Sequence, residues 1–197
     1  DLGHAHAGAQ GMQGARVSAL PRPLSPFNWM VVVENDDHVA FAQVRLVAGK
    51  PLLSRVGIDF FNRLAAPYQP AMTAPWTRVD RFGPDPIARE AFASPALAFF
   101  RWFAAYPALY RIDRKGASTC VWFQDLRFLT PGRDVMPFRY GLCREGQGPW
   151  ERFELDDETP DAPRRFVINH GARVPRDGGG VDQRREAPPY SALMRTA

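Results

Sequence analysis

The chain has 197 residues, of which 45% are hydrophobic, 23% are charged and 12% are aromatic, with 19 prolines and a formal net charge of +4. This composition excludes wholesale disorder, frequent proline disfavours a bundle of long helices, and no apolar run reaches the roughly 18 residues of a membrane-spanning helix. Arginine carries nearly all of the positive charge, scattered without a nucleic-acid-binding motif, so we expect no nucleic-acid partner. Because the chain opens on Asp1 without an initiator Met, we expect a fragment of a longer protein.

The first 18 residues are small and glycine-punctuated, which predicts a linker or the end of a helix that begins upstream. His4 and His6 lie in this segment, and we expect both to be solvated because a metal site needs further ligands. Three prolines within residues 21–26 hold the backbone extended. They predict a strap that crosses a surface and leads into the next strand.

Residues 30–34 are strongly β-branched, residues 35–37 are turn-forming Asn and Asp, and residues 38–47 alternate apolar and polar side chains. This pattern predicts a β-hairpin. Prolines interrupt residues 51–83, which therefore predict short strands or an irregular excursion.

Two helix starts follow, because Asp85 and Ser94 each precede a proline, as a capping residue precedes the first helical position. We expect a short helix over residues 86–92 and an aromatic-rich helix over residues 95–106 that stops before Pro107. The aromatic side chains of the second helix cover more than one face. This distribution predicts packing against a sheet and against a further surface.

The remaining apolar segments predict strands separated by turns. These strands cover residues 109–113, 118–128, 136–144 and 150–155. Hairpins around one helical block indicate an α+β domain in which an antiparallel sheet packs against the helices. We place this domain at residues 19–155 and interpret residues 156–197, rich in Pro, Gly and Arg, as a disordered tail.

The two cysteines, Cys120 and Cys143, lie symmetrically about the expected turn at residues 130–134. On adjacent strands they would sit opposite each other and could form a disulfide in an oxidising compartment or remain buried thiols in a reducing one. Because nothing in the sequence establishes export, we favour free thiols. The cysteines show no zinc-binding spacing, so we expect no metal site in this chain.

The sequence carries none of the familiar catalytic motifs for nucleophilic serine, phosphate loops, zinc proteases or dinucleotides. Two residue pairs are candidates for binding. On a strand, Asp125 and Arg127 would point to one side, either as an ion pair that fixes the sheet, which we favour, or as a site for an anion or a partner. Arg22 and Trp29 in the proline-rich segment offer a docking surface, although a strap with Trp29 buried is the simpler interpretation.

Three separated motifs carry a resemblance to a known family. They are the P-x-P-x-x-P-x-x-W pattern at residues 21–29, the aromatic helix ending in a proline at residues 100–107, and the D-L-R-F segment at residues 125–128. In order and spacing over residues 15–155, the chain resembles the C-terminal soluble part of the YdjM-like membrane-bound metal-dependent hydrolases.

The resemblance implies a bacterial inner-membrane protein whose transmembrane helices and His and Asp metal ligands precede this domain. This sequence lacks those ligand stretches, so a divalent metal is implied for the upstream part alone and the catalytic residues stay unknown. We therefore expect an extramembrane domain that is accessory or regulatory and inactive by itself. Its own transmembrane region is the expected partner, and a membrane surface or a protein regulator is a further candidate.

Two alternatives to the accessory domain remain open at this point. The chain could be a stand-alone hydrolase with a site around Asp125 and Arg127, or a protein-interaction module that uses the proline-rich strap.

Overall fold

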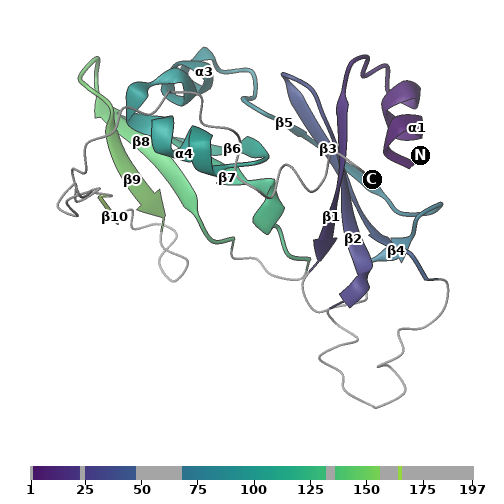
Figure 1. Ribbon diagram of the computed structural model, residues 1–197. Coiled ribbons are helices and arrows are strands. Elements are labelled where there is room, and N and C mark those ends of the chain that lie inside the picture. Colours follow the sequence, from purple (N-terminus) through teal and green to yellow (C-terminus); the bar gives the residue numbers. More distant parts are fainter. Residues whose placement is uncertain (1, 23–24, 48–67, 132–135, 156–163, 166–197) are drawn as a thin grey trace, which may run out of the picture. The chain divides into compact units, whose positions relative to one another are not determined.

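The computed structural model describes residues 2–22, 25–47, 68–131, 136–155 and 164–165, all within one unit of the chain, Asp1–Phe166 (Figure 1). The predicted α+β class is confirmed, but the strands form two sheets instead of the single sheet that we expected. The first sheet contains β1 (Arg16–Arg22), β2 (Ser25–Glu34), β3 (His38–Arg45), β4 (Gln69–Pro70) and β5 (Trp76–Asp80). The second contains β6 (Pro107–Lys115), β7 (Ser118–Asp125), β8 (Arg139–Glu145), β9 (Glu151–Leu155) and β10 (Arg164–Arg165).

The hairpin predicted from residues 30–47 is confirmed as β2 and β3, paired antiparallel with Glu34 opposite Val39. Its turn is closed by the Asn35 side chain, whose Oδ1 accepts the backbone N–H of His38 at 2.8 Å. Asparagine closes turns in this way because its short amide reaches its own neighbouring backbone. β4 and β5 are the short strands expected within residues 51–83, of which residues 51–67 lie outside the described residues.

The proline-rich segment does not cross a surface as a strap, which corrects the sequence-based expectation. Pro21 stands in β1 and Pro26 in β2, and these two strands pair antiparallel with Leu20 opposite Met30. β1 is an edge strand, so a proline there removes no hydrogen bond from the interior of the sheet. β1 begins at Arg16, within the segment of residues 1–18 that we expected to be a linker or the end of an upstream helix.

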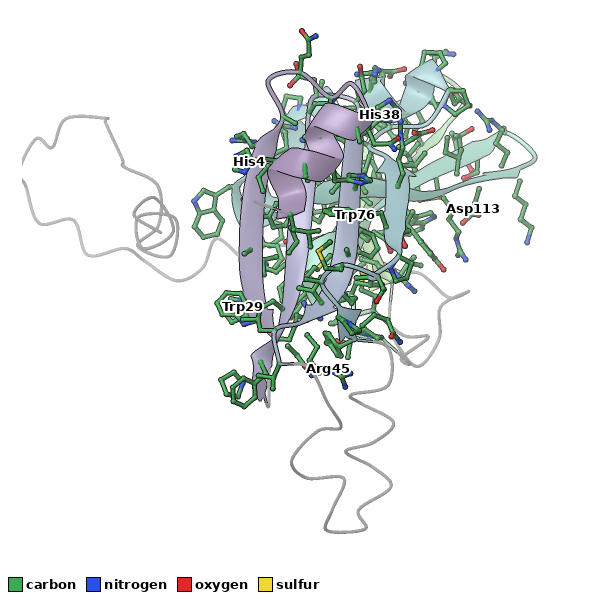
Figure 2. All side chains as sticks on the ribbon, turned by 90° about the vertical axis from the view of Figure 1, so that its right-hand side faces the viewer. His4, Trp29, His38, Arg45, Trp76 and Asp113 are labelled. Carbon is green, nitrogen blue, oxygen red and sulfur yellow. A yellow bond between two sulfur atoms is a disulfide. The ribbon has the colours of Figure 1, made fainter. Side chains whose placement is uncertain are left out.

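Helix α1 (Leu2–Ala9) packs on one face of the first sheet (Figures 1 and 2). Gly3 approaches the sheet so closely that a Cβ atom there would lie 2.3 Å from Cγ1 of Val17. The ring of His6 stacks on that of Trp76 with centroids 3.8 Å apart, and its burial lowers the pKa of His6. His6 is therefore a packing residue, and our expectation that it is solvated was wrong.

Both predicted helix caps are confirmed. The Asp85 carboxylate accepts the N–H of Ile87 at 3.0 Å at the start of α3 (Pro86–Ala93). The Ser94 hydroxyl accepts the N–H of Ala96 at 3.3 Å and begins a 3₁₀ turn, Pro95–Leu97, which leads into α4 (Ala98–Phe103). Within the described residues, no helix combines the length and the apolarity needed to cross a membrane.

The helices cover one face of the second sheet, where Phe100 of α4 packs against Phe123 and Leu142 in a fully buried cluster. Burial, together with the nearby Glu154 carboxylate, raises the pKa of Tyr140 at the edge of this cluster to about 12. We expected α4 to pack against a second surface as well as against the sheet. Its residue Trp102 instead faces solvent and is 73% exposed.

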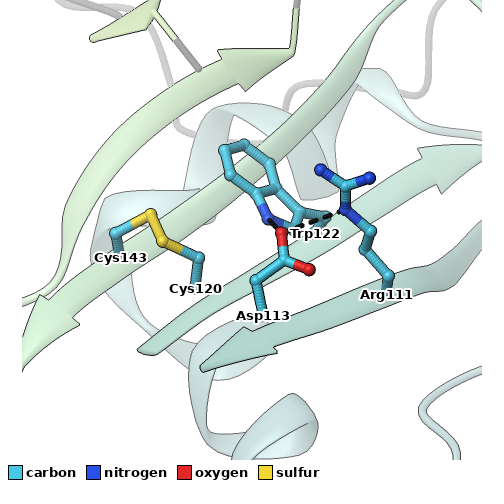
Figure 3. The surroundings of a disulfide bond; sticks show 5 residues. All are labelled: Arg111, Asp113, Cys120, Trp122 and Cys143. Carbon is cyan, nitrogen blue, oxygen red and sulfur yellow. Dashed lines mark hydrogen bonds and ion pairs between the residues drawn. A yellow bond between two sulfur atoms is a disulfide. The ribbon is translucent and has the colours of Figure 1, made fainter. Parts of the chain in front are cut away.

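The opposite face of the second sheet carries Trp122, whose indole lies over Gly141 on the neighbouring strand (Figure 3). A Cβ atom at Gly141 would lie 2.3 Å from Cε3 of Trp122, so this packing requires glycine. The indole N–H donates to the Asp113 carboxylate at 2.8 Å.

Beside Trp122, Cys120 on β7 stands directly opposite Cys143 on β8, which confirms the register expected from the sequence. The two form a disulfide with an S–S distance of 2.05 Å (Figure 3), so our preference for free thiols was wrong. Directly opposed residues in an antiparallel pair place their side chains on one face within bonding reach. The sequence therefore predicted that the two cysteines lie opposite each other, but it did not determine their oxidation state.

Candidate functional site

Asp125 ends β7 and is fully buried, with no exposed side-chain surface. Its carboxylate accepts the backbone N–H groups of Ala105 at 3.0 Å, Tyr106 at 3.1 Å and Arg127 at 3.0 Å. The first two bonds explain why α4 ends at Phe103, three residues before the predicted end at residue 106. The third starts a 3₁₀ turn, Leu126–Phe128, in place of the last three residues of the predicted strand.

Arg127 forms the predicted ion pair with Asp125, with Nη2 to Oδ2 at 3.0 Å. The pair arises from the 3₁₀ turn and not from alternation along a strand, which corrects our reasoning for it. The guanidinium also donates to the Phe103 carbonyl at 3.2 Å and lies over the rings of Phe103 and Phe128. Arg127 therefore connects the end of α4 to the end of β7.

Arg22 links the first sheet to this region. Its Nη1 donates to the Arg127 carbonyl at 2.9 Å and its Nη2 to the Leu129 carbonyl, while the residue as a whole is 7% exposed. Three of the four predicted binding residues, Arg22, Asp125 and Arg127, thus meet at one place. We call this place, where the first sheet, the end of α4 and residues 125–129 come together, the junction.

Trp29, the fourth predicted binding residue, lies elsewhere. It packs with Ala42 and Val44 on the face of the first sheet that carries α1, whereas Met30 on the opposite face contacts Arg22. The indole N–H of Trp29, which is labelled in Figure 2, donates to the Pro26 carbonyl at 2.9 Å. Trp29 is half-buried in the described structure and does not contribute to the junction.

Sequence reasoning missed three polar residues beside the junction, Asn28, Gln43 and Arg45. The face of the first sheet that holds Met30 is apolar at Val39 and Phe41 and then turns polar at Gln43 and Arg45. Gln43 lies opposite Met30 and Asn28 lies opposite Arg45, so these side chains share that face. We call Arg22, Asn28, Gln43 and Arg45 the polar strip.

The polar strip contains buried atoms without hydrogen-bond partners. They are Nε of Arg22, Nε of Arg45, and both the nitrogen and the oxygen of the Gln43 carboxamide. Leaving a buried polar group unpaired costs about 1–3 kcal/mol. Among the described residues, no carboxylate forms an ion pair with Arg22 or Arg45.

The signal for the polar strip was present in the sequence. Residues 39, 41, 43 and 45 lie on one face of a strand, and the change from apolar to polar side chains along them could have been read from alternation alone. What alternation could not supply was the neighbouring Arg22, because a bulge at Pro21 and Arg22 shifts the register of β1 against β2.

The described residues offer no group of three or more His, Cys, Asp or Glu side chains that could hold a metal ion. His38 (Figure 2), at the start of β3, pairs with Asp80 of β5 at 2.8 Å.

Comparisons with known proteins found no matching family model, no matching curated protein and no matching solved structure.

Proposed function

We propose that this chain is an accessory, extramembrane domain of a larger bacterial inner-membrane protein of the YdjM-like hydrolase type, and that it is not catalytic by itself. One observation carries the proposal. Two of the three motifs on which the resemblance rests meet at the junction, through the backbone after α4 and through Asp125 with Arg127, and Arg22, which stands between two prolines of the first motif, bonds to the same place. Motifs that meet where the two sheets come together have a structural role in the domain.

The buried state of Asp125 argues against the stand-alone hydrolase. A general base must reach a substrate proton, whereas this carboxylate already accepts three backbone N–H groups and pairs with Arg127. The structure also argues against a protein-interaction module that uses the proline-rich segment as an extended strap, because Pro21 and Pro26 belong to paired strands. The disulfide between Cys120 and Cys143 supports a position on the oxidising side of the membrane.

The proposal is tested in the native host with an antibody raised against this domain. We expect a species larger than 22.1 kDa in the inner-membrane fraction, and a soluble species of that mass would contradict the proposal. The purified chain, assayed with ester and phosphoester substrates and added divalent metal, should show no hydrolysis. Hydrolysis that is lost in Arg127→Gln and kept in the exposed control Arg78→Gln would establish the rival enzyme instead.

A further inference from the structure

We propose that one end of the first sheet docks on an anionic phospholipid bilayer. Among the described residues, six large apolar side chains are exposed, and four of them lie at this end of the sheet. They are Phe27 (49% exposed), Leu46 (62%), Val47 (49%) and Met72 (92%), and we call them the apolar tip. Exposed apolar side chains that occur singly need no explanation, whereas a group of them marks a site of interaction.

Three neighbouring strands bring the apolar tip together. β2 starts and β3 ends at this end of the sheet, where the Leu46 N–H donates to the Phe27 carbonyl at 2.9 Å. β4 runs parallel to β3 with Pro70 opposite Arg45, so it finishes at the same end. Met72 stands two positions after Pro70, in the turn that follows β4. The tip is therefore a set of strand ends and a turn, all at one end of the sheet.

The charge around the apolar tip suits an anionic surface. The segments that carry the tip are residues 26–30, 43–47 and 68–74, and they contain a single charged residue, Arg45, although 23% of the chain is charged. Arg22, at the end of β1 opposite Ser25, adds a second positive charge beside them. No carboxylate of these segments has to lose its water against negatively charged lipid phosphates. Positive side chains next to apolar ones are the combination that binds to anionic bilayers.

Trp29 lies behind the apolar tip and supports the same assignment (Figure 2). It follows Phe27 by two positions on β2, so both rings lie on one face of the strand. Because its indole N–H already donates to the Pro26 carbonyl, the ring can leave water without an unpaired donor. Tryptophan is enriched at the headgroup level of bilayers. The choice of a bilayer over a protein partner rests on the proposed function, which keeps this domain beside the inner membrane.

Flotation of the 197-residue chain with lipid vesicles tests the proposal. We expect the chain to float with vesicles of phosphatidylglycerol and phosphatidylcholine, and more weakly with vesicles of phosphatidylcholine alone. Arg45→Gln should lower the affinity for the anionic vesicles roughly fivefold and leave the affinity for the neutral vesicles unchanged, because only the anionic surface attracts the lost charge. A chain that stays in solution with both kinds of vesicle would overturn the proposal.

Substitutions in the apolar tip show whether it makes the contact. Leu46→Ser/Met72→Ser removes its two most exposed side chains and should lower vesicle affinity at least about tenfold. Trp102→Ala is the matched control, because Trp102 is equally exposed to solvent but lies on α4, and it should bind as the unmodified chain does. Both variants replace exposed side chains, so they should keep the midpoint of thermal unfolding. Equal affinity of the two variants would place the contact elsewhere and refute the assignment.

A nitroxide-labelled lipid locates the contact independently. In nanodiscs that carry it, the methyl signals of Leu46, Val47 and Met72 should broaden, and that of Ala93, exposed on α3, should keep its intensity. A dimer that forms without lipid and that Leu46→Ser/Met72→Ser dissociates would assign the tip to a second copy of the chain and overturn the proposal. All these measurements use the purified chain and none uses cell fractionation, so failure of this proposal and failure of the proposed function are distinguishable.

Discussion

The Asp125 side chain joins the end of α4 to the 3₁₀ turn that follows β7. Its carboxylate takes the N–H groups of Ala105 and Tyr106 at the end of α4 and that of Arg127 at the start of the 3₁₀ turn. Replacing it with Ala would leave these N–H groups without their acceptor and would remove the ion pair of Arg127. We expect Asp125→Ala to lower the free energy of unfolding by roughly 3 kcal/mol.

Urea denaturation measures this loss, and Asp36→Ala is the matched control because Asp36 is exposed in the turn between β2 and β3. The control should change the free energy of unfolding by less than about 0.5 kcal/mol. A loss below 1 kcal/mol in Asp125→Ala would mean that the carboxylate does not hold the junction.

The sequence predicted the pairing of Asp125 with Arg127 but not the bonds that give Asp125 its role. A side-chain pair two residues apart can be inferred from local sequence, whereas the N–H groups of Ala105 and Tyr106 come from a helix end about 20 residues away. Tertiary bonds of this kind leave no periodic pattern. For Trp29 the sequence left docking and burial open and favoured burial, and the structure packs it, half-buried, against Ala42 and Val44.

At the scale of elements, the disulfide joins β7 and β8 across the middle of the second sheet. Cys120 and Cys143 are 23 residues apart, and closing a loop of that length in the unfolded chain stabilises the fold by about 3 kcal/mol. We expect Cys120→Ser/Cys143→Ser to lower the free energy of unfolding by about that amount. Dithiothreitol should destabilise the unmodified chain equally and leave the double variant unchanged.

Alkylation of protein isolated from the host, denatured but not reduced, shows whether the disulfide exists there. If both cysteines were alkylated without reduction, the disulfide and the oxidising location inferred from it would be refuted. Reaction after reduction alone is the expected result.

Element boundaries were predicted well where local chemistry sets them and poorly where tertiary contacts do. Asp85 and Ser94 each cap a helical start, as their sequence indicated. The end of α4 and the end of β7 were both misplaced, by about three residues, because the Asp125 carboxylate determines both. The alternation of apolar and polar residues also could not predict that the strands divide into two sheets, because it specifies the two faces of a strand and not which strands are its neighbours.

At the scale of the whole described fold, one apolar cluster is shared by the two sheets. Met30, Val32 and Phe41 of the first sheet pack with Tyr106, Ala108 and Leu126 from the region of the second, and Arg22 adds its bonds to the Arg127 and Leu129 carbonyls. Burial raises the pKa of the Tyr106 hydroxyl within this cluster. A shared core makes each sheet depend on the other for stability, so the two should unfold as one cooperative unit.

Leu126→Ala tests this coupling, because Leu126 is 2% exposed and contributes to the shared cluster alone. We expect the free energy of unfolding to fall by roughly 3 kcal/mol, as for other buried leucines. Native-state hydrogen exchange should then show equal losses of protection for Val32 in the first sheet and Phe123 in the second. Trp102→Ala is the control, since its side chain is 73% exposed, and it should leave both amides unchanged. Loss of protection confined to one sheet would show that the two sheets fold independently and that the junction joins them without coupling them.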